Sequence, residues 1–445
     1  MELTWYSWLI SFLPILTVVI LMIVFKWSGT RAAAASWLVA TGLAVAFFGA
    51  DIQLLSVAQV KAFLLAMDVL WIVWGAISFY HLANEGGTIR LIGDLVPLWM
   101  KDRSLQVLMV TLVLTSFMQG MGGFGVPVAI CAPILVAMGF SAVDAVVMAC
   151  LGHAWAVSFG TIGAAFNAMV AVTGLPPELL APDTAVLLGA AIFPCAALIL
   201  LIAQGKKGLL HGLPAVLLLS LGMGVAMYLM AANKMSNIAI FGATIVGAAL
   251  LFLIRRLPRY REGKAFSTDT EEASPRERFS AKRVRIALIP NILLVSLGVT
   301  IALVPPLKAT LETLRFSLDF PEVSTALNWV TPAGQSKVFY PLEHAGTLTM
   351  LVVIIGGFVY AQNGLLHRDS PAKILNRSLR TSLEPSLGIL AMVAVSQIMT
   401  HSGMTSLLAR GLGESINRYL YPATVPFLGM LGAFLTGSNN NSNVL

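Results

Sequence analysis

Hydrophobic residues are gathered into long runs along the whole chain, and short polar segments separate these runs. An α-helix rises 1.5 Å per residue and a bilayer has a hydrocarbon core about 30 Å thick, so a run of about 20 apolar residues spans it. The pattern therefore predicts an all-α polytopic membrane protein. Its ten full membrane-spanning helices are predicted at about residues 8–25, 33–50, 60–83, 143–172, 184–203, 212–232, 238–254, 286–305, 344–360 and 386–401.

Residues 105–140 are also apolar, but the glycine-rich run Gln119–Gly125 breaks them into two arms that are short for full spans. Basic residues mark cytoplasmic loops, and their positions require this segment to enter and leave on the cytoplasmic side. Lipid cannot pair the N–H and C=O groups of a non-helical tip, so such a tip is stable only where it lines a cavity. We expect a re-entrant hairpin whose tip faces a binding site.

The second half of the chain repeats this arrangement. In each half an apolar span ends at a glycine turn, and an amphipathic stretch and an apolar arm follow. Gly87 and Gly120 are 33 positions apart, and Gly403 and Gly437 are 34 positions apart. The basic loops give the two copies opposite orientations. Inverted repeats with interrupted segments at matching positions are the pattern of a secondary transporter whose site lies near the bilayer midplane.

These features divide the chain into six segments. We expect the second hairpin to be truncated, because the chain stops inside its polar break. The segments are N-terminal transmembrane helices at 1–59, the first repeat with its hairpin at 60–172, transmembrane helices at 173–254, a basic cytoplasmic linker at 255–285, transmembrane helices at 286–383 and the inverted second repeat at 384–445.

Composition supports the membrane assignment. Hydrophobic residues are 58% of the chain and charged residues only 11%, against roughly 45–50% and 25% in soluble domains. The formal charge of +7 comes from Lys and Arg in loops, which set topology and do not indicate a nucleic-acid partner. Lys26 and Arg31 follow the first apolar run, the reverse of a signal peptide, so we expect this run to stay as a span in the plasma membrane.

The two polar breaks and a Gly- and Thr-rich stretch at Ser158–Gly163, which we expect to be unwound, form the predicted substrate site. Broken helices present free N–H groups and the positive end of the helix dipole to an anion. Glycines allow close approach of the backbone, and Asn and Ser side chains bind carboxylate and hydroxyl groups. The alternatives are close helix packing for the glycines and a solvated loop for the polar run. The predicted substrate-binding residues are Gln119, Gly120, Gly122, Gly123, Phe124, Gly125, Ser158, Thr436, Ser438, Asn439, Asn440, Asn441, Ser442 and Asn443.

Ionisable residues inside predicted spans are candidates for ion coupling, because a charge at the helix centre costs at least about 2.5 kcal/mol. Asp68 and His153 lie well inside their spans and are the predicted proton-coupling residues. For His153 an interhelical hydrogen bond is the alternative. For Asp144 and Glu384, nearer span ends, helix capping or complementation of the helix dipole is the preferred interpretation. Sodium is the competing coupling ion, since unwound carbonyls bind it.

Four segments are similar to the lactate permease family: Asp68–Ile77, Gln119–Phe140, Leu151–Gly160 and Thr436–Leu445. The resemblance implies inner-membrane symport of L-lactate with protons, and D-lactate and glycolate as additional substrates. Where family members carry Glu-Gly-Ala-Ser-Gly-Phe-Gly, this chain has Gln-Gly-Met-Gly-Gly-Phe-Gly. A carboxylate is thus replaced by Gln119 and a serine by Gly122.

The sequence therefore predicts a carrier that imports a small monocarboxylate with a proton, without a cofactor or a metal. Another small organic anion, driven by sodium or protons, is the alternative within transport. A membrane enzyme would need catalytic groups at helical spacing, which the six histidines do not show. A channel would show a symmetric polar ring in preference to inverted repeats. The pattern leaves the oligomeric state open.

Overall fold

The computed structural model describes residues 4–88, 91, 100–121, 126–261, 281–336 and 338–415, together with 423, 425, 426, 429, 430, 433, 439 and 443. Within these residues the chain is almost entirely helical, and six helices are long and apolar enough to cross a membrane. The six are α1 (Trp5–Ile23), α3 (Ile52–Glu85), α10 (Pro177–Ala232), the run of η2 and α11 (Ser236–Ile254), α16 (Ala345–Gln362) and α17 (Ser370–His401).

The remaining helices are shorter or less apolar. They are α2 (Gly29–Ala46), α5 (Arg103–Leu108), the π-helix η1 (Met109–Leu114), α6 (Thr115–Met121), α7 (Val126–Ala137), α8 (Ala142–Ala154), α9 (Gly160–Thr173), α12 (Pro258–Arg261), α14 (Ala281–Leu303), α15 (Pro305–Leu311) and α18 (Met404–Ser415). The all-helical, membrane-type fold is confirmed. The number of spans, the re-entrant hairpins and the six-segment division stay predictions.

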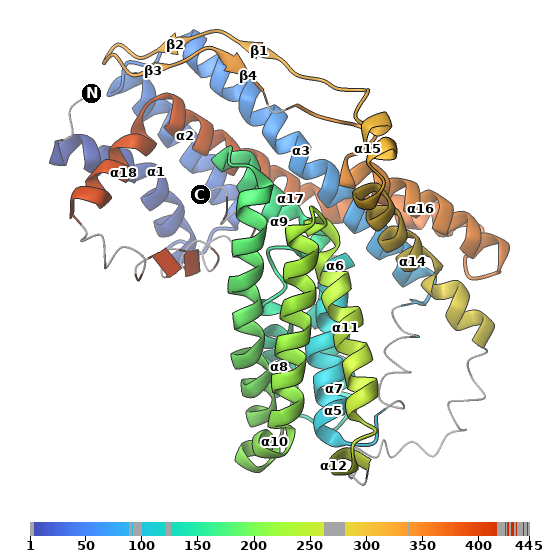
Figure 1. Ribbon diagram of the computed structural model, residues 1–445. Helices are drawn as coiled ribbons and strands as arrows, with labels where there is room; N and C mark the ends of the chain where they lie inside the picture. Colours follow the sequence, from blue (N-terminus) through green and yellow to red (C-terminus); the bar gives the residue numbers. More distant parts are fainter. Residues whose placement is uncertain are drawn as a thin grey trace.

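Helix α3 forms the centre of one half of the molecule, where it packs against α16 and α17 (Figure 1). It begins at Asp51, whose carboxylate accepts a hydrogen bond from the Leu54 N–H at 2.7 Å and so caps the first turn. The crossing with α16 is close: a Cβ on Gly75 would come within 3.0 Å of the Gly346 carbonyl oxygen. This small-residue contact holds the start of α16 against the middle of α3.

The first predicted hairpin corresponds to α5, η1 and α6, which follow one another directly, and to α7, which packs back against η1 and α6. The π-helix in the first arm has its Thr115 hydroxyl bonded to the Val110 carbonyl at 2.7 Å, five residues back. At the far ends of the two arms the Arg103 guanidinium lies 5.9 Å from the Phe140 ring centroid. The segment therefore starts and finishes at the same place in the structure.

Helix α10 contains two of the predicted spans, 184–203 and 212–232, in one helical run that reverses direction at its lower end in Figure 1. Gly205 lies at this bend with φ +66°, a conformation that glycine adopts without steric penalty. Away from the bend, the two halves of α10 pack closely on each other: a Cβ on Gly189 would lie 3.4 Å from the Gly224 Cα.

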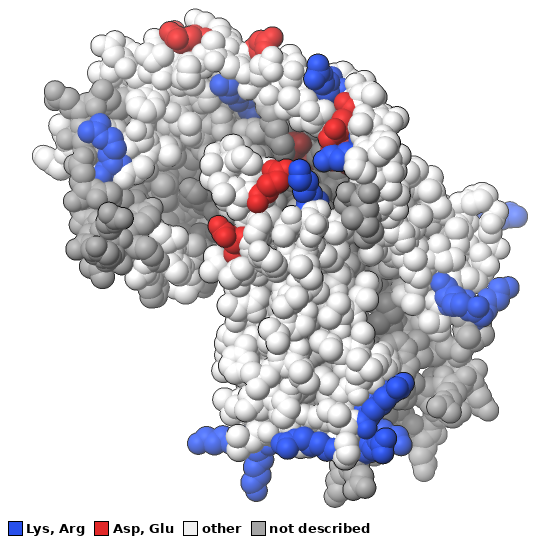
Figure 2. Space-filling model, in the orientation of Figure 1, with Lys and Arg blue, Asp and Glu red and all other residues white. Residues whose placement is uncertain are grey.

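The end of the bundle that holds the α10 bend is basic. Figure 2 shows Lys and Arg side chains gathered there. Arg259 of α12 donates hydrogen bonds to the His211 and Leu210 carbonyls, both at 3.0 Å, and His211 in turn pairs with Asp102 at 2.9 Å. These contacts join α12, α10 and the start of α5 at one face. By the positive-inside rule this face is expected to be cytoplasmic.

A loop between α15 and α16 carries four two-residue strands at the other end of the molecule (Figure 1). β1 (Asp319–Phe320) pairs with β4 (Gly334–Gln335), and β2 (Val323–Ser324) pairs with β3 (Val330–Thr331), both antiparallel. No strands were expected here, because two residues are too few to show an alternating pattern. The loop is bound to the start of α3, since the Ala326 N–H donates to the Gly49 carbonyl at 2.9 Å.

Candidate functional site

Helices α8 and α9 are separated by a break at residues 155–159, inside what the sequence presented as one span, 143–172. The next residues remain irregular: Thr161, Ile162 and Gly163 have φ of 51°, 55° and 76°. β-Branched residues rarely take the left-handed conformation, which costs roughly 1–2 kcal/mol per residue. The expected unwinding around Ser158–Gly163 is present, and strained backbone of this kind is typical of binding sites.

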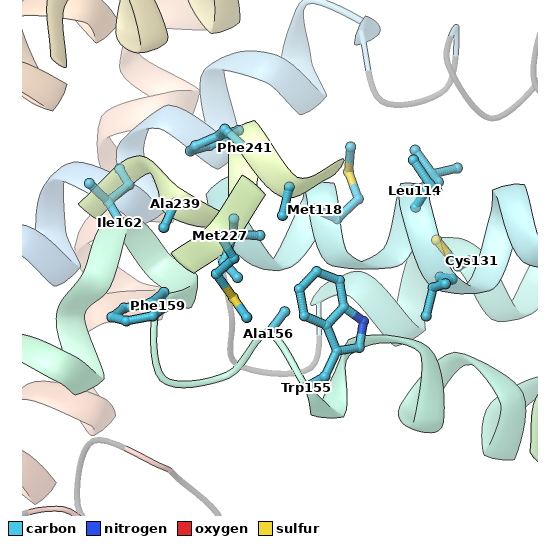
Figure 3. Close-up of a cluster of buried hydrophobic side chains, with 14 of the residues drawn as sticks. Leu114, Met118, Cys131, Trp155, Ala156, Phe159, Ile162, Met227, Ala239 and Phe241 are labelled. Carbon is cyan, nitrogen blue, oxygen red and sulfur yellow. The ribbon is translucent and has the colours of Figure 1, made fainter. Parts of the chain in front are cut away.

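An apolar cluster fixes this break in place. In Figure 3 the buried side chains of Trp155, Phe159 and Ile162 lie among residues of neighbouring helices, including Met118 of α6 and Phe241 of α11. The Trp155 indole N–H is fully buried and finds no acceptor in the described part of the chain. An unpaired buried donor costs about 1–3 kcal/mol, which is tolerated most often at functional positions.

The end of the first hairpin arm touches the break directly. Gln119, with only 7% of its surface exposed, lies against Gly160, where an added Cβ would come within 2.7 Å of the amide nitrogen. Gly120 packs beside the Phe241 ring, which leaves 3.3 Å for a Cβ. Two predicted site residues, Gln119 and Ser158, are thereby brought to one place from elements about 40 residues apart.

The C-terminal polar run reaches the same break. The Asn439 amide donates to the Ser158 hydroxyl at 3.3 Å, and the Asn443 amide donates to the Ala165 carbonyl at 2.8 Å. Ser158 and Asn439 are 281 positions apart. Residues from both predicted repeats therefore meet at the irregular backbone between α8 and α9, as the site hypothesis requires.

The other predicted substrate-binding residues cannot be placed with Gln119, Gly120, Ser158, Asn439 and Asn443. They lie outside the described residues and stay predictions: Gly122, Gly123, Phe124, Gly125, Thr436, Ser438, Asn440, Asn441 and Ser442.

The predicted coupling residue Asp68 is buried in α3, with 7% of its surface exposed. Its carboxylate oxygen lies 3.2 Å from Nε2 of His344, the residue that precedes α16. The other ring nitrogen of His344, Nδ1, accepts a hydrogen bond from the Gly346 N–H at 3.2 Å. Nδ1 is therefore unprotonated, and Nε2 carries the hydrogen that it donates to Asp68.

His344 was missed as a site residue. The sequence places it at the head of the span 344–360, where a polar residue marks a boundary equally well. Only the close packing of α3 on α16 reveals that this boundary residue faces Asp68, 276 positions away.

His153, the second predicted coupling residue, lies in the last turn of α8. Its Nδ1 is 2.8 Å from the Ala149 carbonyl, one turn back in the same helix. An interhelical hydrogen bond of His153 is not found among the described residues, so that alternative stays untested. The structure pairs Asp68 with His344, and a coupling role for His153 stays a prediction.

The two acidic residues interpreted as caps differ. Asp144 lies in the first turn of α8 next to Ser141, whose hydroxyl accepts from the Asp144 N–H at 3.1 Å and donates to its carboxylate at 2.7 Å. The capping interpretation is confirmed there. For Glu384 it is wrong, because α17 begins fourteen residues earlier, at Ser370, and Glu384 lies exposed in its interior.

A cavity of about 670 Å³ reaches Asp68 from the end of the molecule that carries the strands. Its walls come from α3, the end of α9, α17 and the loop at residues 316–339. Among the described residues no group of three or more His, Cys, Asp or Glu side chains has an arrangement that would hold a metal ion.

A sequence model of the family described as L-lactate permease matches residues 7–445. The chain belongs to the L-lactate permease family. Its members are permeases and not enzymes, and membership together with the apolar helices makes this a multi-pass protein of the bacterial inner membrane.

Individual relatives are distant but cover almost the whole chain. The chain is 26% identical to the L-lactate permease of Salmonella typhimurium and 26% identical to that of Escherichia coli K12. It is 24% identical to the Glycolate permease GlcA of Escherichia coli K12. Each match covers 99% of this chain and 82% of the relative.

Proposed function

We propose that this permease imports L-lactate, and also D-lactate and glycolate, by proton symport. The observation that carries the proposal is the family match over nearly the whole chain, with relatives named for L-lactate and for glycolate. These substrates share a carboxylate and a hydroxyl on the adjacent carbon. The site must therefore bind both groups and tolerate either hydrogen or methyl beside them.

The break between α8 and α9 suits that task. The start of a helix carries the positive end of the helix dipole, which attracts a carboxylate without a formal charge. Ser158, Asn439 and Asn443 lie at the break and offer hydroxyl and amide groups for the substrate hydroxyl. The rest of the proposed site consists of the glycine-rich tip after Gly120 and the polar run 436–443.

We infer that the architecture is one of ten spans and two re-entrant hairpins in inverted repeats. The contact of Arg103 with Phe140 supports the first hairpin, since both ends of it lie together. The approach of Asn439 and Asn443 to the break supports a counterpart at the C-terminal end. Transport would then proceed by alternating access, with one repeat moving relative to the other around the site.

Proton coupling follows from charge. A lactate anion that enters alone moves against the inside-negative potential, at about 2.3 kcal/mol per charge and 100 mV. A proton bound by Asp68 and shared with His344 removes that penalty, because the pair gains the positive charge that the substrate lacks. His153 is the second candidate for this proton.

A substrate panel tests the proposal. The purified protein in proteoliposomes is expected to take up labelled L-lactate, and unlabelled D-lactate and glycolate are expected to compete. Succinate and lactamide, which differ in charge from a monocarboxylate, serve as controls. Competition by succinate alone would assign the protein to another organic anion.

Gly123→Leu tests the proposed tip. The larger side chain is expected to abolish uptake while membrane insertion stays normal, because bulk would fill the space beside the substrate. Unchanged uptake would remove the tip from the site.

A further inference from the structure

The cavity above Asp68 contains a second ionisable side chain, Lys61 of α3. Lys61 and Asp68 are seven residues apart, two helical turns and about 10 Å along α3, so both face the same side of the helix. Both line the cavity of about 670 Å³. Pockets that bind small molecules have volumes of roughly 300–1,000 Å³, so this cavity has room for a short acid.

The surroundings of Lys61 leave its charge uncompensated. Its ammonium lies 3.1 Å from His401 Nε2 and 5.0 Å from the Phe320 ring centroid. His401 Nδ1 lies 2.8 Å from the main-chain carbonyl oxygen of Gln397. Because a carbonyl only accepts, Nδ1 carries the ring hydrogen. The nitrogen that faces Lys61 is then a neutral acceptor.

No carboxylate pairs with Lys61 within the described part of the chain. Lys308, another partly buried lysine at this end, pairs with Glu312 and Glu343 at 3.5 and 3.4 Å. A partly buried cation is more stable with a counter-ion than without one. An imidazole and an aromatic ring orient the ammonium but do not neutralise it. An anion that enters the cavity would supply the missing counter-charge.

The rest of the wall is suited to a short carboxylate. The Gln397 amide and the Thr400 hydroxyl of α17 line the cavity together with Lys61 and provide neutral donors. Trp71 and Trp74 supply apolar surface; their indole N–H groups are engaged by Thr347 and Ser386 at 2.8 and 2.9 Å, so the rings are fixed. Fixed aromatic faces provide an apolar surface for a methyl group.

We propose that Lys61 forms the anion-binding element of a second carboxylate site, on the outer side of the permease and distinct from the break between α8 and α9. The site takes a short monocarboxylate, whose charge pairs with the ammonium held by His401. Asp68, which His344 contacts at 3.2 Å, lies in the same wall. Substrate and proton are therefore collected in one cavity before they reach the broken helices. This inference rests on the proposed function for the identity of the anion.

Equilibrium binding tests the site without relying on transport. Purified wild-type protein and Lys61→Gln are titrated with L-lactate, acetate and the neutral analogue lactamide by isothermal calorimetry. Wild type is expected to bind both acids and not lactamide, and Lys61→Gln to weaken both acids about tenfold or more, because the charge is lost. Lys61→Arg, which keeps the charge, is expected to stay within about threefold of wild type.

Lys206→Gln, at the α10 bend, is the matched control for loss of one positive charge and is expected to bind as wild type does. Thermal unfolding of each variant separates loss of binding from loss of fold. If Lys61→Gln misfolds, the same titrations are made with Lys61→Arg and Thr400→Val. Thr400→Val is then expected to weaken acid binding.

The outcomes separate this site from the proposed function. Equal acid affinity in wild type and Lys61→Gln, or no acid binding by wild type, overturns the site. If wild type and Lys61→Gln transport lactate with the same KM, the second site is overturned and the proposed function still holds. Wild type that binds acetate through Lys61 but does not transport lactate overturns the function and leaves the site standing.

Discussion

The Asp68 carboxylate and the His344 imidazole lie 3.2 Å apart, at the point where α3 crosses the start of α16. The Gly346 N–H fixes the His344 ring from its other side, at 3.2 Å from Nδ1. Without the extra proton, a neutral imidazole bonds to a carboxylate. An added proton gives either a charged imidazolium that bonds to the carboxylate or a neutral imidazole that bonds to a neutral carboxylic acid. Both outcomes add one positive charge in a buried place.

Asp68→Asn is expected to abolish accumulation of lactate driven by a pH gradient, because the amide cannot bind a proton at this position. Exchange of internal for external lactate, which needs no net proton movement, is expected to continue. The measurement is uptake with and without a gradient, next to counterflow in the same vesicles. Asp144→Asn, which changes a cap on α8, is the control and should accumulate lactate normally.

His344→Gln and His153→Gln discriminate between the two histidines. His344→Gln is expected to shift the pH profile of uptake and reduce its maximum about tenfold, since the proton loses one of its two sites. His153→Gln is expected to keep the profile, because within the described residues His153 bonds to Ala149 of its own helix, at 2.8 Å. The reverse result would assign the proton to His153.

Gly160→Ala tests the contact between the first hairpin arm and the break. The new Cβ would approach the Gln119 amide nitrogen to 2.7 Å, and Gln119 is buried, so the side chain has little room to move. Overpacking is expected to lower stability by about 1–3 kcal/mol. The double variant Gly160→Ala with Gln119→Ala should recover most of this loss in a thermal unfolding assay.

This prediction is contradicted if the double variant is destabilised by the sum of the two single losses. It would mean that Gln119 and Gly160 do not press on each other, and that the arm and the break are independent.

Ser158→Ala is expected to raise KM for L-lactate several-fold, since it removes the hydroxyl that Asn439 contacts at 3.3 Å within the proposed site. Ser141→Ala removes a hydroxyl of the same kind at the start of α8. It should lower stability by about 1 kcal/mol, as loss of an N-cap does, and leave KM unchanged. Parallel uptake kinetics and thermal unfolding separate the two effects.

The sequence was most informative where structure depends on local pattern. Long apolar runs predicted a helical membrane protein, and the glycines and threonine of Ser158–Gly163 predicted the break between α8 and α9. Each of these follows from residues close together in the chain. The convergence of Ser158 with Asn439 was predicted only because an internal repeat connects distant segments.

Contacts that depend on which helices are neighbours were not predictable. His344 reads as a span boundary, and Glu384 reads as a cap because the amphipathic start of α17 hides the true beginning of that helix at Ser370. Lys61 and His401 are 340 positions apart, and neither carries a local signal for the other. The two-residue strands are too short for any alternation to show.

Lactate uptake into sodium-free proteoliposomes, with the membrane potential clamped by potassium and valinomycin, tests the central claim most directly. An imposed gradient, acidic outside, should drive accumulation of L-lactate above its external concentration, and a protonophore should abolish it. Uptake that ignores the pH gradient, or that appears only when an inward sodium gradient is supplied, would contradict proton symport by this permease.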